Sequence, residues 1–168
     1  LGAALGGTYH GFAKVMDQDI LQLVWKATIL AIGIGSLGMV AGSATAVTAG
    51  FSRKLLLVIA AAEFAFYAWW TLDQDDFIYV IADTGIAMAL VAALHGWSAI
   101  RGGDRASFWM LGGVGVSVLA AGVQAGGVDL HRNFNHNDLF HVIQITAMPL
   151  FYIGARALRD RAQSGKMA

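Results

Sequence analysis

The chain has 168 residues, of which 57% are apolar and only 13% are charged. A soluble domain carries about a quarter charged residues, so a water-soluble globule of this composition would expose too much apolar surface. Basic and acidic residues balance at 11 each and cysteine is absent, which argues against nucleic-acid partners, disulfides and thiolate metal sites. The composition therefore favours a polytopic membrane protein over a cytosolic enzyme.

Six apolar stretches separated by short polar breaks predict an all-α transmembrane bundle. A bilayer core of about 30 Å requires roughly 20 apolar residues of helix, whereas the strands of a membrane barrel are shorter and alternate in polarity. We expect helices at Leu1 to about Met16, about Ile20 to Thr48, Lys54 to Leu72, Phe77 to Ile100, Ser107 to Gly127 and Asn137 to Arg159. Because no long linker divides them, we expect residues 1–168 to form one bundle.

The first stretch is too short for a full span, and the chain starts with Leu rather than Met. It lacks the basic start of a signal peptide and is followed at once by another span. We therefore expect the natural protein to begin further upstream and to have seven helices.

Basic residues gather at one end of the predicted helices and aspartates at the other. The basic end holds Arg53, Lys54, Arg101, Arg105, Arg156, Arg159, Arg161 and Lys166. The opposite end holds Asp17, Asp19, Asp73, Asp75, Asp76, Asp129 and Asp138. Since loops rich in Lys and Arg stay in the cytoplasm, we expect the basic end and the C-terminus to be cytoplasmic, in a bacterial inner membrane.

Polar side chains interrupt the apolar stretches below the acidic end. The helical rise places His10, Lys26 and Asp83 roughly 9 Å deep and His141 roughly 6 Å deep, with Glu63 nearer the midplane. Ionisable groups inside a bilayer cost several kcal/mol unless they are paired or hydrated. We interpret Lys26, Glu63 and Asp83 as a buried network that fixes the packing or as an ion path, with the alternative that Lys26 reaches out to the surface.

Small residues in the second stretch predict a seam for close helix packing. They are Ala31, Gly35, Gly38, Gly42 and Ala46. His95, near the basic end, is expected to be an ordinary histidine with its hydrogen bonds satisfied.

The densest polar feature runs from Asp129 to Gln144 and contains His131, His136 and His141. Neutral imidazole is the commonest protein metal ligand. Residues five apart on a helix diverge by roughly 140°, so His136 and His141 converge only if His136 lies at the unwound start of the last helix.

Two interpretations of this segment stay open. In the first, Asn135 and Asp138 cap the helix, and the loop histidines are merely exposed. In the second, a metal ion is held by His10 and His141, with His136 or Asp138 as a third ligand. His10 supports the second interpretation because it lies at a depth similar to that of His141.

The layout resembles the CREST superfamily of seven-helix membrane hydrolases, which includes alkaline ceramidases and the progestin/adiponectin receptors. Gly6-Gly-Thr-Tyr-His10 is similar to the family's Ser-x-x-x-His motif, with Asp17 or Asp19 in place of the aspartate that follows. Asn137-Asp-Leu-Phe-His141 is similar to the family's final His-x-x-x-His motif. Gly6 replaces the family serine and Asn137 the first histidine, while His136 lies one residue earlier.

The resemblance implies a zinc-dependent hydrolase of a lipid amide or ester, with membrane lipids as its partners. Zinc lowers the pKa of a bound water towards about 7 and polarises a carbonyl. Asp17, Asp19 and Asp138 are the candidate general bases. Two alternatives stay open: a b-type haem bound between His10 and His141, and a non-catalytic accessory or receptor-like subunit of a membrane complex.

Overall fold

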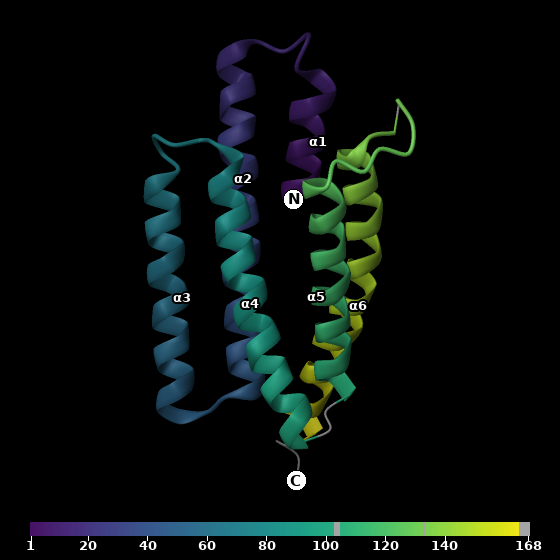
Figure 1. The fold of residues 1–168 in the computed structure, drawn as a ribbon. Helices are drawn as coiled ribbons and strands as arrows, with labels where there is room; N and C mark the ends of the chain where they lie inside the picture. The colour runs from purple at the N-terminus through teal and green to yellow at the C-terminus, as the bar shows by residue number, and fades with distance from the viewer. Residues whose placement is uncertain (103–104, 133, 165–168) are drawn as a thin grey trace. The chain divides into compact units, whose positions relative to one another are not determined.

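The computed structural model describes residues 1–102, 105–132 and 134–164. The all-α prediction is confirmed, because these residues form helices close to the predicted ranges (Figure 1). The helices are α1 (Gly2–Phe12), α2 (Gln18–Val47), α3 (Gly50–Trp70), α4 (Phe77–Gly102), α5 (Arg105–Ala125) and α6 (His136–Ser164). Lys166 lies outside the described residues, as do the side chains of Arg159 and Arg161.

Within the described residues, four helical segments are long and apolar enough to cross a membrane. They are α2, α4, α5 and residues His136–Leu158 of α6. The 21-residue α3 carries Arg53, Lys54 and Glu63, and α1 has only 11 residues. The fold is thus compatible with a membrane protein, and the six expected stretches differ in how well each is suited to span a bilayer.

The chain divides into two compact units, which are described separately. The N-terminal unit is Leu1–Leu90, and the C-terminal unit is Val91–Ala168. The helix α4 contributes its first half to the N-terminal unit and its second half to the C-terminal unit.

In the N-terminal unit, α2 packs against α1 and α3. A Cβ at Gly33 would lie 2.5 Å from a ring carbon of Tyr67, so only glycine gives this ring room. The Tyr67 hydroxyl donates a hydrogen bond of 3.0 Å to the carbonyl of Ile29. Tyr67 therefore fixes the contact between α2 and α3 through both its ring and its hydroxyl.

The predicted small-residue seam is not where this close approach occurs. Within the N-terminal unit, no described atom would lie within 4 Å of a Cβ added at Gly35, Gly38 or Gly42. Gly33, which lies between Ala31 and Gly35 but does not belong to the predicted pattern, is the position against which Tyr67 packs.

In the C-terminal unit, α5 and α6 pack side by side (Figure 1). A Cβ at Gly113 would lie 2.7 Å from the ring of Phe151, and one at Gly154 would lie 2.8 Å from the sulfur of Met110. Each helix thus offers a glycine to a large side chain of the other. The chain leaves α5 through Gly127, whose φ of +61° is a conformation that glycine adopts without strain.

Candidate functional site

The start of α6 is capped as the first interpretation of the histidine segment predicts. The Asn135 Oδ1 accepts the backbone N–H groups of Asn137 and Asp138 at 2.9 and 3.3 Å. In return, the Asp138 carboxylate accepts the backbone N–H of Asn135 at 3.0 Å. This reciprocal pair satisfies backbone donors that the first turn of a helix leaves without partners. Asp138 therefore has a structural role, whatever its role in chemistry.

His136 is the first residue of α6, and its ring is held by an aspartate that the sequence analysis did not name as a ligand. The Asp129 Oδ1 lies 2.8 Å from the His136 Nδ1 and accepts the His136 backbone N–H at 2.6 Å. Hydrogen bonds from the His136 ring and backbone hold the pKa of the exposed Asp129 below its ordinary value. Because Nδ1 of the His136 ring contacts Asp129, Nε2 is the ring nitrogen through which His136 could bind a metal ion.

The other two histidines of this segment have different surroundings. The His141 side chain is exposed on α6, and its ring meets that of Phe140 edge to face at 5.0 Å. His131 lies in the loop, where its backbone pairs with that of Phe134. The His136 ring is oriented by a carboxylate, whereas the His141 ring contacts an aromatic neighbour.

The remaining candidates lie exposed in the N-terminal unit. His10 is in the last turn of α1, with its ring edge to face against Tyr9 at 5.2 Å. Asp17 is the N-cap of α2, where its carboxylate accepts the backbone N–H of Asp19 at 2.9 Å. Asp19 adds a second negative charge to the first turn, which the helix dipole favours.

The predicted metal ligands are distributed over both units, with His10 in the N-terminal unit and His136 and His141 in the C-terminal unit. Within either unit, the described part of the chain contains no group of three His, Asp or Glu side chains placed to hold a metal ion. The Asp129–His136 pair is therefore the arrangement within one unit that comes nearest to metal-site chemistry.

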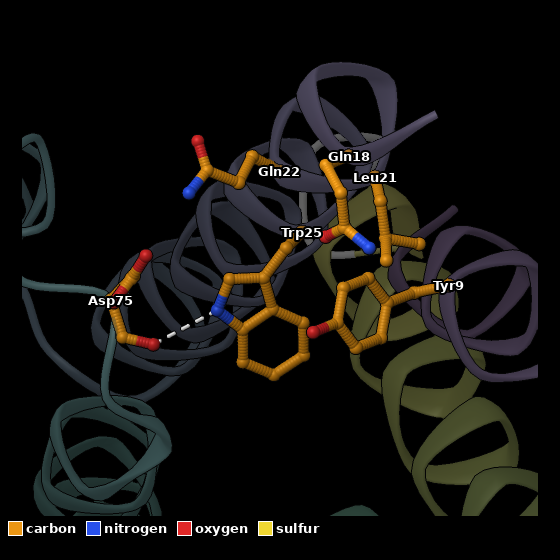
Figure 2. A pocket seen from close by; sticks show the side chains of 6 residues that line it. All are labelled: Tyr9, Gln18, Leu21, Gln22, Trp25 and Asp75. Carbon is orange, nitrogen blue, oxygen red and sulfur yellow. Dashed lines mark hydrogen bonds between the residues drawn. The ribbon is translucent and has the colours of Figure 1, made fainter. Parts of the chain in front are cut away.

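A hollow of about 360 Å³ lies at the acidic end of the N-terminal unit (Figure 2). The Trp25 ring packs against that of Tyr9 at 4.8 Å, and its indole N–H donates to the backbone carbonyl of Asp75 at 2.9 Å. Gln18, Leu21 and Gln22 complete the wall (Figure 2). Aromatic faces and amide groups of this kind can hydrogen-bond or stack on a polar headgroup.

Lys26 of α2 lies beside this hollow and caps the C-terminal end of α3. Its ammonium group donates to the carbonyls of Thr71 and Leu72 at 2.7 and 3.0 Å and lies 3.9 Å from the Asp75 carboxylate. These carbonyls are among those that a helix C-terminus leaves unbonded, and a positive charge there is favourable. These contacts fit the alternative in which Lys26 reaches out to the surface, rather than the one in which it joins Glu63 and Asp83 in a buried network.

Three polar side chains of the N-terminal unit form what we call the buried carboxyl layer: Ser36 on α2, Glu63 on α3 and Asp83 on α4. Ser36 and Asp83 are each 3% exposed. Glu63, which is partly exposed, and Ser36 lie near the Asp83 carboxyl, but among the described residues neither carboxylate oxygen of Asp83 has a partner at hydrogen-bond geometry. Sequence analysis named Glu63 and Asp83 but missed Ser36.

The buried polar groups of the C-terminal unit are paired. The His95 Nδ1 lies 2.9 Å from the Ser107 Oγ, and both residues are fully buried. The Gln144 amide donates to the Ser117 hydroxyl at 3.0 Å, which joins α6 to α5. The expectation that His95 is a satisfied histidine is confirmed.

Comparison with known proteins identifies the family of the chain. The sequence model of a family of unknown function (DUF6962) matches residues 1–160, and the chain therefore belongs to this family. No curated protein and no solved structure matches the chain.

Proposed function

We propose that this member of the DUF6962 family is an integral membrane protein that hydrolyses a lipid amide or ester with a zinc ion bound at the start of α6. The contact between Asp129 and the His136 ring is the observation that carries the proposal. A histidine that binds a metal through one ring nitrogen almost always gives the other to a carboxylate or carbonyl, which fixes the ring and raises its basicity. Asp129 supplies such a carboxylate.

The competing explanation is that Asp129 and His136 form a surface ion pair. A pair between exposed groups contributes little to stability because water screens it, so it does little to hold this loop by itself. The position of His136 favours a metal site over a surface ion pair, because His136 is the first residue of a helix that is apolar enough to span a membrane. A ligand held there would meet lipid carbonyl groups near the membrane surface.

The residues of the chain would have the following roles. His136 would bind the zinc ion, with Asp129 orienting its ring, and we propose His10 and His141 as the other ligands. When bound, zinc polarises a substrate carbonyl and lowers the pKa of water. Asp17, Asp19 and Asp138 would be the candidates for the general base.

We further propose that the basic end of the helices faces the cytoplasm of a bacterial cell, with the C-terminus on that side. Arg53 and Lys54 lie near the start of α3, whereas Arg101 lies in the last turn of α4 and Arg105 is the first residue of α5. Basic residues in such short connections are retained on the cytoplasmic side. The start of α6 then opens towards the outer leaflet.

Elemental analysis of the purified full-length protein tests this proposal. We expect stoichiometric zinc, and loss of zinc in His136→Ala, with His10→Ala and His141→Ala measured beside it. Asp129→Asn should weaken zinc affinity by about 10- to 100-fold, the usual effect of removing such a supporting carboxylate. His131→Ala is the matched control, since it removes a histidine from the same segment and should leave zinc in place.

Activity is measured as release of fatty acid from ceramide and from fatty-acyl esters in vesicles, with and without a chelator. Zinc-dependent release that disappears in His136→Ala supports the proposal. A protein without stoichiometric zinc contradicts it. A Soret band would instead indicate haem, and a metal-free protein that co-purifies with stable partners would indicate an accessory subunit.

A further inference from the structure

The buried carboxyl layer of the N-terminal unit is independent of the proposed zinc chemistry. Ser36 and Asp83 lie on buried stripes of their helices, and the partly exposed Glu63 lies between two buried residues of its own stripe: Ile29, Gly33, Ser36 and Val40 on α2, Ala60, Glu63 and Tyr67 on α3, and Val80, Asp83 and Ala87 on α4. The three- and four-residue spacings bring each stripe to one face of its helix. The layer is thus polar, with apolar residues of the same stripes above and below it.

The Ser36 hydroxyl behaves differently from the threonine hydroxyls of α2 and its C-cap. Thr28, Thr45 and Thr48 each donate to the carbonyl four residues earlier in the helix, at 2.6 to 2.9 Å. Among the described residues, Ser36 has no hydrogen-bond partner although it is buried, and it faces the Asp83 carboxyl. A serine in a helix ordinarily satisfies its hydroxyl on its own backbone. The Ser36 hydroxyl oxygen is therefore available to bind another group.

No basic side chain of the described N-terminal unit balances the two carboxyl groups. The Lys26 ammonium is bound to the carbonyls at the end of α3, and the Arg53 guanidinium donates to the Thr48 carbonyl at 2.8 Å. Lys14 and Lys54 lie at the ends of α1 and α3. Two carboxylates this close cannot both stay ionised in an apolar interior unless a cation or a proton joins them.

We propose that Ser36, Glu63 and Asp83 bind a small monovalent cation such as Na⁺, in exchange for one of the two protons that otherwise neutralise the two carboxyl groups. The groups that face the pair are the Ser36 hydroxyl from α2 and the Tyr67 phenol from α3. The Tyr67 hydroxyl already donates to the carbonyl of Ile29. Ser36 is therefore the neutral oxygen available to the cation.

The oxygen-only donor set favours a monovalent ion over a divalent one. The layer offers four carboxylate oxygens and one hydroxyl. Calcium takes six to eight oxygen ligands, and magnesium retains several waters in octahedral geometry, for which a buried site between three helices has little room. A monovalent cation together with one retained proton neutralises the pair with fewer ligands.

Carbodiimide labelling tests the exchange, because the reagent modifies protonated carboxyl groups buried in membrane helices. The purified full-length protein is labelled at mildly acid pH in choline chloride or in sodium chloride, and the modified residue is found by peptide mass spectrometry. We expect labelling of Glu63 or Asp83 that is several-fold slower in sodium than in choline. We expect Ser36→Ala to require a several-fold higher sodium concentration for the same protection.

Ser43→Ala is the matched control, since Ser43 lies two turns further along the same face of α2 and is equally buried. It should leave protection by sodium unchanged. Equal labelling in sodium and choline overturns the proposal, as does labelling confined to loop aspartates. Protection by calcium or magnesium but not by sodium overturns it too. Binding of radioactive sodium that is lost in Asp83→Asn but retained in His136→Ala would support it separately from the zinc proposal.

Discussion

Two sets of buried polar groups, one in each unit, differ in whether their members are paired. In the C-terminal unit, His95 and Ser107 bond to each other, and Gln144 bonds to Ser117. In the N-terminal unit, Ser36 and Asp83 face each other without a hydrogen bond of normal geometry. A buried polar group without a partner costs about 1–3 kcal/mol, so paired groups indicate structure, and unpaired ones indicate a missing ligand.

The largest effect should come from breaking the pair between His95 and Ser107. His95→Ala leaves the buried Ser107 hydroxyl without this partner and opens a cavity, which should lower the free energy of unfolding by about 2–4 kcal/mol. Thermal or denaturant unfolding in detergent micelles measures the change. If the two residues stabilise the fold through each other, the double variant with Ser107→Ala should lose less than the sum of the two single losses. Additive losses would contradict this.

A smaller effect should follow removal of the hydrogen bond between α5 and α6. Gln144→Leu should cost about 0.5–1.5 kcal/mol, because Ser117 keeps its second bond, to the carbonyl of Gly113. Thr146→Val is the control, since the Thr146 hydroxyl bonds only within its own helix, to the carbonyl of Ile143. If both variants were as stable as the natural chain, the hydrogen bond between Gln144 and Ser117 would not contribute to the stability of the fold.

Features set by neighbours along the chain were the ones that the sequence predicted well. Apolar runs located the helices, and the spacing of Asn135 and Asp138 identified the cap that starts α6. A cap forms among residues a few positions apart, so its pattern is visible in the sequence. The same local logic suggested that Lys26 lies near the acidic end of its helix.

Features set by contacts between helices were predicted poorly. Gly33 and Gly35 look alike in the sequence, but only Gly33 meets Tyr67, because the rotation of α2 against α3 decides which glycine is covered. Ser36 is a small neutral residue with no local sign of a role, and it becomes noticeable only where it faces Asp83. The contact of Asp129 with His136 depends on the path of a loop, which has no periodicity to detect.

The smallest change in stability should come from Asp83→Asn, although Asp83 is only 3% exposed. In sodium-free buffer the free energy of unfolding should stay within about 1 kcal/mol of its natural value, because the substitution breaks no hydrogen bond and removes one of two facing carboxyl groups. Added sodium should raise the unfolding temperature of the natural chain and leave that of Asp83→Asn unchanged, since a ligand stabilises only the protein that binds it. The comparison with His95→Ala then separates two kinds of burial: one variant loses stability in every salt, and the other loses only its response to sodium. A loss for Asp83→Asn as large as that for His95→Ala would mean that the carboxyl layer is structural after all.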